Sequence, residues 1–416
     1  MPEERALKAQ KVISKVYKTQ NDTIFHRNKT TNDDMLVAKR LGASIMTPLC
    51  SRAASRTAIR ETNELLVSEV KSKRVVTLNR PKALNALNLP MIRSLYPKLK
   101  EWNDDKRVSM VIMKGSGEKA FCAGGDVLAV TKSAKANDGS TVHKDFFYEE
   151  YKLNHLIGTL SKPYVALIDG ITMGGGCGLS VNGRFRVATE RTMLAMPETA
   201  LGLFPDVGGS YFLSRLRSNL GMYLALTGYR LQAADVYHAG LATHIVNSKD
   251  LAELEKALLD ISSEQITDRR VDELLKEFRP NDVKTFSLEN EVNNIEKLFE
   301  GKKLEDILEN LADDNSEWAQ KQLKTLSKMS PTSMKVTFRQ LKEGLTLSYP
   351  NVFTMEYRLT QRFVEDCDFH EGCRASMLIV KYIAINRTFS VLIDKDRNPK
   401  WNPTRIEDVT DEKEIG

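Results

Sequence analysis

The pattern of hydrophobic residues changes along the chain, and this change limits the folds that it can form. Up to about residue 250, short runs rich in Val, Ile and Leu alternate with longer segments whose apolar residues are spaced three and four apart. The first pattern predicts β-strands and the second predicts amphipathic helices. Strands are predicted at residues 65–67, 74–78, 108–113, 163–168 and 185–188, and helices at residues 83–100, 146–160 and 176–182. Alternating strands and helices indicate an α/β fold.

Beyond residue 250 the strand pattern fades and helical spacing remains. Helices are predicted at residues 254–261, 271–278, 288–299, 304–311 and 318–326, with a further helical region from residue 330, where Pro331 takes an early helical position. We therefore predict three parts: an N-terminal arm at residues 1–62, an α/β core at residues 63–250 and a helical C-terminal region at residues 251–416.

The positive charge is concentrated in the N-terminal arm. Residues 1–60 hold twelve Lys or Arg and five Asp or Glu, whereas the whole chain of 416 residues has a formal net charge of +6. The remainder of the chain is therefore close to neutral. This argues against nucleic acid as a partner, because phosphate backbones are bound by clustered cations.

Part of this arm has the composition of a targeting sequence. Residues 35–60 contain no acidic residue and are rich in Arg, Ser, Ala and Thr, which is typical of a mitochondrial presequence. We therefore predict a mitochondrial matrix protein; a disordered arm without a targeting role is the alternative. The segment before Met35 carries acids, so Met35 is interpreted as a usable second start.

Cysteine, histidine and hydropathy argue against several classes of site. The five cysteines include no Cys-x-x-Cys pair, and the six histidines are scattered, so we predict no metal site. No apolar run is long enough to span a bilayer, so a membrane is not an expected partner.

Two glycine-rich segments follow predicted strands. Residues 121–126 read Phe-Cys-Ala-Gly-Gly-Asp, and residues 172–178 read Thr-Met-Gly-Gly-Gly-Cys-Gly. Glycine lets a ligand approach the backbone closely, so two such turns side by side could direct two N–H groups at one oxygen, forming an oxyanion hole. Ordinary tight turns are the alternative.

Other interpretations of these segments are less favoured. The spacings of dinucleotide-binding and phosphate-binding loops are absent. Cys122 and Cys177 have no histidine nearby in the sequence, so the two cysteines are interpreted as small packing residues.

Two carboxylates lie in the apolar segment that follows. Glu198 is preceded by Met196 and Pro197, and Asp206 by Phe204 and Pro205. Burial among apolar residues would raise the pKa of either carboxyl towards the range of a catalytic base. The alternatives are a helix N-terminal acid for Glu198 and a turn residue for Asp206.

Together these motifs resemble the signature of the crotonase (enoyl-CoA hydratase/isomerase) superfamily. The resemblance is based on residues 119–126, the glycine triplet 174–176, residues 196–198 and the turn 208–209, and it covers about residues 64–249. It implies a spiral of ββα units that binds an acyl-CoA thioester, followed here by the helical C-terminal region. Coenzyme A is then part of the substrate, and no separate cofactor is expected.

The resemblance also implies roles for individual residues. Gly125 and Gly175 supply the two N–H donors of the oxyanion hole, and Glu150, Gly175, Glu198 and Asp206 contact the substrate. Hydratases of the superfamily carry a second catalytic glutamate just after the glycine triplet, where this chain has Gly178. We therefore predict a thioester hydrolase in which Glu198 acts on the carbonyl and Asp206 orients water or a substrate hydroxyl. A solvated charge on a helix surface is the alternative for Glu150.

Within the superfamily the chain is most similar to a hydrolase branch, which it resembles at residues 146–151, 170–176, 204–209, 329–333, 368–372 and 394–401. This resemblance implies hydrolysis of 3-hydroxyisobutyryl-CoA to 3-hydroxyisobutyrate and free CoA in valine breakdown. An enoyl-CoA hydratase or isomerase, or another acyl-CoA thioesterase, is the first alternative. A non-catalytic mitochondrial protein associated with the ribosome is an alternative of another class. The sequence leaves the oligomeric state open, with a homo-oligomer as one option.

One segment departs from the family pattern. Residues 376–390 separate two motifs that lie almost next to each other in the family, and they are rich in apolar and β-branched residues. We interpret this insert as a retained intron rather than a functional loop, because an apolar loop of this kind would expose an aggregation-prone surface.

Overall fold

The computed structural model describes residues 63–136, 140–376 and 398–410, which belong to one compact unit that spans residues 60–416. The predicted presequence, Met35 and the insert beyond Ser376 lie outside the described residues. The boundaries predicted for the three parts of the chain therefore stay predictions.

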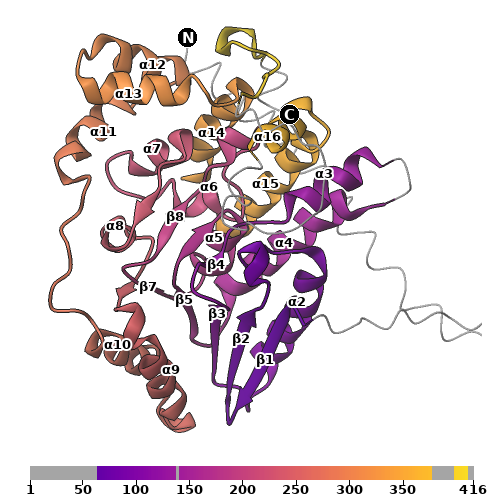
Figure 1. The fold of residues 1–416 in the computed structure, drawn as a ribbon, viewed down its shortest axis with the longest axis vertical. Coiled ribbons are helices and arrows are strands. Elements are labelled where there is room, and N and C mark those ends of the chain that lie inside the picture. The colour runs from indigo at the N-terminus through magenta and orange to yellow at the C-terminus, as the bar shows by residue number, and fades with distance from the viewer. Residues whose placement is uncertain (1–62, 137–139, 377–397, 411–416) are drawn as a thin grey trace, which may run out of the picture. The chain divides into compact units, whose positions relative to one another are not determined.

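Two β-sheets form the centre of this unit (Figure 1). The larger sheet has the order β1-β2-β3-β5-β7-β10 and comprises β1 (Leu65–Val70), β2 (Lys73–Leu78), β3 (Met110–Gly115), β5 (Tyr164–Ile168), β7 (Phe185–Ala188) and β10 (His244–Ile245). Only β1 runs antiparallel to its neighbour. The smaller sheet has the order β4-β6-β8-β9 and comprises β4 (Ala120–Cys122), β6 (Ile171–Met173), β8 (Met193–Ala195) and β9 (Leu231–Gln232). The five predicted strands are confirmed; β4, β6, β8, β9 and β10 were not predicted, since two or three residues are too few for a visible alternation.

The chain repeats a unit of one strand in each sheet followed by a helix. The units are β3-β4-α3 with α3 at Val127–Lys135, β5-β6-α5 with α5 at Gly175–Ser180, and β7-β8-η2 with the 3₁₀-helix η2 at Glu198–Leu201. This repeat confirms the predicted spiral of ββα units. Because β4, β6 and β8 are parallel neighbours, the segments that follow them meet at one edge of the smaller sheet, where α/β proteins commonly bind ligands.

Successive residues of the central strands face opposite sides of the larger sheet, as strand geometry requires. Met110 and Ile112 pack with α9 (Leu251–Asp260) and α10 (Asp268–Glu277) in one hydrophobic core, whereas Val111 and Met113 belong to the main core on the other side. The helices α9 and α10 therefore cover the side of the sheet that faces away from the main core.

The remaining helices surround the main core. They are α2 (Leu89–Asp104), α4 (Val142–Thr159), α6 (Gly209–Phe212), α7 (Leu220–Thr227), α8 (Ala234–His238), α11 (Val292–Leu298), α12 (Leu304–Asp313), α13 (Glu317–Leu326), α14 (Pro331–Gly344), α15 (Tyr349–Phe363) and α16 (Cys367–Ser376). The predicted C-terminal helices are confirmed. Among them, α14 packs on α6, α15 packs on α4 and α6, and α16 packs on η2. The helices α14, α15 and α16 therefore lie over the ends of the smaller sheet, whereas α9 and α10 do not.

The helix predicted at residues 83–100 begins six residues later. Leu84 and Asn85 have left-handed φ angles of 51° and 56°, and α2 starts only after Asn88, whose side chain accepts a hydrogen bond from the Met91 N–H (2.9 Å). The amide of Asn85 donates to the backbone oxygen of Ala120 (2.8 Å) and thereby holds this segment on the second sheet. The apolar spacing at residues 84–87 thus reflects burial against that sheet and not a helical turn.

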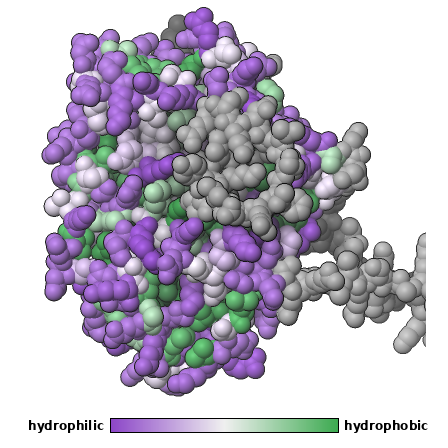
Figure 2. Space-filling view, viewed as in Figure 1, coloured by the Kyte–Doolittle hydropathy of each residue, from purple (hydrophilic) through white to green (hydrophobic). Residues whose placement is uncertain are grey.

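No helix in the described ranges is long and apolar enough to cross a membrane. On the face shown in Figure 2, hydrophilic residues predominate and hydrophobic ones form small, separate groups.

Candidate active site

The two glycine-rich turns lie next to each other. They follow the paired strands β4 and β6, and a Cβ atom built on Gly175 would lie only 3.3 Å from the Gly125 nitrogen. Gly174 has a φ of 46° and Gly124 a φ of 112°, both of which favour glycine. The structure therefore brings the predicted oxyanion-hole residues Gly125 and Gly175 together.

Three buried carboxylates act on one another beside the glycine triplet, and two of them lie directly against it. Glu150 comes from α4, Glu198 begins η2 and Asp206 precedes α6, and their exposed fractions are 2%, 5% and 4%. A Cβ atom on Gly175 would lie 2.5 Å from Glu150 Oε1, and one on Gly174 would lie 2.9 Å from Glu198 Oε1. The predicted substrate-contacting residues thus form one cluster, and Glu150 is not a solvated helix charge.

Burial controls the charge of this cluster. Burial, and then the charge of Asp206, raise the pKa of Glu198 well above its ordinary value. Burial, and then Asp206 and Glu198, raise the pKa of Glu150 in the same direction. Within the described part of the chain, Glu150 Oε1 and Glu198 Oε2 are buried and accept no hydrogen bond. Buried oxygens of this kind normally have partners, so these two are suited to receive protons from substrate or water.

The third carboxylate has a partner that the sequence did not reveal. Tyr151 donates its hydroxyl proton to Asp206 Oδ2 (2.6 Å), and Thr360 Oγ1 of α15 lies 2.7 Å from the same tyrosine oxygen. Burial raises the pKa of Asp206 to about 6, although the Tyr151 hydrogen bond opposes the rise. Tyr151 could have been suspected from its place beside Glu150 on the same predicted helix, but nothing in the sequence points to Thr360.

The raised pKa of Asp206 predicts a pH-dependent stability. Its folded-state value of about 6 exceeds the ordinary 3.8, so the stability that the proton provides is complete below pH 4 and is lost as the pH rises to 6. We expect the free energy of unfolding of Asp206→Asn, relative to wild type, to increase by roughly 1–3 kcal/mol between pH 4 and pH 8. Denaturant titrations at both pH values measure it. A difference that stays constant with pH would contradict the burial of an ionisable Asp206.

Position 178 has no space for a second glutamate. A Cβ atom on Gly178 would lie 2.7 Å from Asn154 Nδ2 and 2.8 Å from the Cβ atom of Val207. Asn154 and Val207 therefore fill the space that a side chain at position 178 would need. The chain instead brings its additional carboxylate, Glu150, to the turn from α4.

The two cysteines in the glycine turns are fully buried. Burial raises the pKa of Cys122 to about 12 and that of Cys177 well above its ordinary value. Both thiols therefore stay protonated at neutral pH, which supports their interpretation as packing residues.

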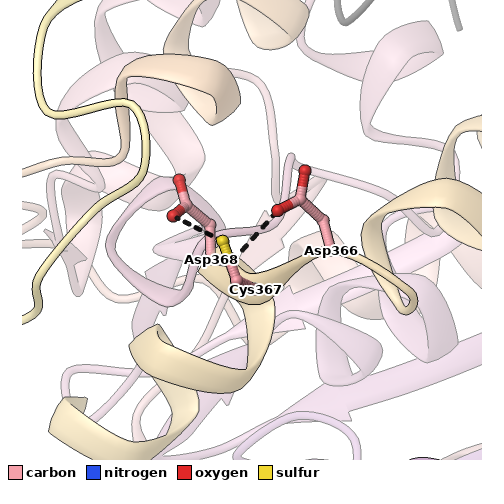
Figure 3. Close-up of side chains that lie close together, drawn as sticks. All are labelled: Asp366, Cys367 and Asp368. Atoms are coloured by element: carbon pink, nitrogen blue, oxygen red, sulfur yellow. Dashed lines mark hydrogen bonds between the residues drawn. The ribbon is translucent and has the colours of Figure 1, made fainter.

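One group of potential metal ligands occurs among the described residues, at Asp366, Cys367 and Asp368 (Figure 3). The buried carboxylate of Asp368 accepts hydrogen bonds from Ser330 Oγ (2.7 Å) and from the Asn402 N–H (2.8 Å). These bonds join α16 to the start of α14 and to the C-terminal segment. Asp368 therefore has a structural role at this junction.

Comparison with known proteins gives a consistent result. A family model described as enoyl-CoA hydratase/isomerase matches residues 73–414. The protein named "3-hydroxyisobutyryl-CoA hydrolase, mitochondrial" from Xenopus laevis is 54% identical to this chain, over 81% of this chain and 84% of its own length. The protein of the same name from Homo sapiens is 49% identical, over 84% of this chain and 86% of its own length.

Solved structures show the same fold. A carnitinyl-CoA dehydratase from Mycobacterium thermoresistibile is similar with a TM-score of 0.75 and 32% identity, and an enoyl-CoA hydratase from Rhodobacter sphaeroides with a TM-score of 0.72 and 33% identity. Each comparison covers 85% of this chain and 96% of the other protein.

Proposed function

Because the chain belongs to the enoyl-CoA hydratase/isomerase (crotonase) family, we propose that it hydrolyses 3-hydroxyisobutyryl-CoA to 3-hydroxyisobutyrate and free CoA, a step of valine breakdown. The observation that carries this proposal is the cluster of three buried carboxylates around two glycine turns, in a chain about half identical to relatives named for that reaction. Those relatives are also named as mitochondrial, so we place the reaction in mitochondria.

The glycine turns polarise the thioester. Its carbonyl oxygen accepts hydrogen bonds from the N–H groups of Gly125 and Gly175, whose turns are adjacent. As the carbonyl carbon becomes tetrahedral, negative charge develops on this oxygen, and fixed N–H donors stabilise it. This explains why both turns need glycine at the point of contact.

Glu198 performs the bond-forming step. In one route its carboxylate takes a proton from water while the water oxygen bonds to the carbonyl carbon; in the other it attacks that carbon and water releases the resulting anhydride. Either way the carbon–sulfur bond breaks, and the CoA thiolate receives a proton. Burial raises the pKa of Glu198 well above its ordinary value, which makes its carboxylate a stronger base than an exposed glutamate.

Asp206 and Glu150 orient the acyl group and water. Asp206 Oδ2 already accepts the Tyr151 proton, so its remaining lone pairs can accept the proton of the substrate's β-hydroxyl. Glu150 Oε1 lies against the Gly175 turn, where it can fix the position of water beside the carbonyl. Both assignments follow from the chemistry of carboxylates as hydrogen-bond acceptors.

The packing at Gly178 disfavours hydration as the reaction, since paired glutamates across a double bond cannot form there. We expect the purified protein to release free thiol from 3-hydroxyisobutyryl-CoA without hydrating crotonyl-CoA. A thiol reagent measures the first reaction, and loss of the enoyl-thioester ultraviolet absorbance measures the second. Hydration faster than thiol release would reverse this assignment in favour of a hydratase.

A further inference from the structure

The turn that carries Asp206 is held in an unfavourable backbone conformation. Val207 has a φ of 52°, which β-branched residues rarely adopt, and Gly208 follows with a φ of 92°. Such conformations persist only where the surroundings fix them. Asn182 Nδ2 donates to the Val207 oxygen (2.9 Å) and Gln340 Nε2 donates to the Pro205 oxygen (2.7 Å), so the turn is fixed from outside on both sides.

A fourth buried carboxyl group makes two further contacts with this turn from outside. Glu356 of α15 is 0% exposed. Its Oε2 accepts the Gly208 N–H (2.8 Å) and its Oε1 accepts the Ser210 N–H (2.9 Å). Burial raises the pKa of Glu356 to about 8, although the hydrogen bonds from Gly208 and Ser210 oppose the rise. Its two partners are the second and fourth residues after Asp206, so they determine where the turn lies.

A second residue of the same helix acts on the Asp206 side chain. Thr360 lies one helical turn after Glu356, and its Oγ1 is 2.7 Å from Tyr151 Oη, the donor to Asp206. Thr360 is 0% exposed and Tyr151 is 3% exposed. The backbone of Asp206 is thus set through Glu356, and its carboxylate through Thr360 and Tyr151.

We propose that Glu356 and Thr360 are positioning residues, through which α15 orients Asp206 for recognition of the substrate's β-hydroxyl. This rests on the proposed function, because Asp206 has its role only in that reaction. Neither side chain contacts the reacting atoms; each acts through Asp206. The C-terminal helical region would then determine substrate selectivity as well as cover the site.

The test compares Glu356→Gln with wild type on two substrates, 3-hydroxyisobutyryl-CoA and isobutyryl-CoA, which lacks the hydroxyl. Gln can accept only one of the two amide protons, so the turn loosens. We expect the selectivity, defined as the ratio of kcat/KM for the two substrates, to fall about tenfold or more. The rate with isobutyryl-CoA should change little, because Asp206 has no hydroxyl to bind there.

Asp235→Asn is the matched control. Asp235 is also a buried carboxylate that holds a loop, since it accepts the Ser287 N–H (2.8 Å), but it lies on α8. This variant should lose stability without losing selectivity. If Glu356→Gln likewise loses stability while its selectivity stays at the wild-type value, Glu356 is purely structural and the proposal is wrong.

A double-mutant cycle shows whether the effect passes through Asp206. In an Asp206→Asn background, Glu356→Gln should lower selectivity no further, and an additive loss would overturn the proposal. If Glu356→Gln fails to fold, the selectivity of Thr360→Val tests the proposal, because this change removes one hydroxyl and keeps the shape of the side chain. An unchanged selectivity in Thr360→Val would contradict the role of α15.

If wild type shows no selectivity at all, the proposed function fails first. Amide hydrogen exchange at Gly208 and Ser210 then tests Glu356 independently, with faster exchange expected in Glu356→Gln. Unchanged exchange would overturn its role in holding the turn.

Discussion

Glu198→Gln is expected to lower kcat for thioester hydrolysis by roughly 10²–10⁴-fold, the usual worth of a positioned base. The amide keeps the shape of the side chain but cannot take a proton from water or attack the carbonyl. KM should stay close to wild type, because the oxyanion-hole amides of Gly125 and Gly175 still hold the substrate. Steady-state release of free thiol measures both constants.

A surface variant separates catalysis from stability in this experiment. Glu343→Gln makes the same chemical change on α14, where Glu343 pairs with Arg339 on the surface (2.9 Å), and it should leave kcat unchanged. The wild-type rate should also rise with pH as the buried Glu198 loses its proton. Glu198→Gln should lack the contribution of Glu198 and keep that of Asp206, whose pKa is raised to about 6. A kcat for Glu198→Gln within about threefold of wild type would show that this carboxylate does not perform the step assigned to it.

The order of strands and helices could be predicted because each long element carries its own hydrophobic period. Residues 164–168 are apolar throughout and lie between Pro163 and Gly170, which indicates a buried strand without any tertiary information. The short strands of the second sheet have no such signal. They exist because they pair side by side, as β6 does with β4 and β8, and pairing over a long sequence distance is not visible in a local pattern.

The site also contains residues that the local sequence reveals and residues that only tertiary contacts reveal. Glu198 and Asp206 could be identified because a carboxylate in an apolar, Pro- and Gly-rich segment is unusual. Glu356 and Thr360 could not, because they lie on a helix about 150 residues after Asp206 and have ordinary helical spacing. Their importance comes from the turn they hold, whose left-handed Val207 has no signature in the residue types. Tertiary contacts, not local sequence, complete the site.

The β-hydroxyl of the substrate is expected to have a large effect on kcat/KM. A buried site built to bind a hydroxyl rejects an analogue that lacks it, because the site's own polar groups are then left without a partner. Asp206 is 4% exposed and is held by Tyr151, so it cannot turn to solvent to find another donor. We therefore expect kcat/KM to be roughly 10²–10⁴-fold higher for 3-hydroxyisobutyryl-CoA than for isobutyryl-CoA.

The ratio of kcat/KM for these two thioesters, measured by release of free thiol from the purified protein, tests the central claim most directly. The account predicts a large preference for the hydroxylated substrate in wild type and its near disappearance in Asp206→Asn, which can no longer accept the hydroxyl proton on a charged oxygen. Equal or faster hydrolysis of isobutyryl-CoA by the wild-type protein would contradict the account, since the buried carboxylates would then serve some other substrate.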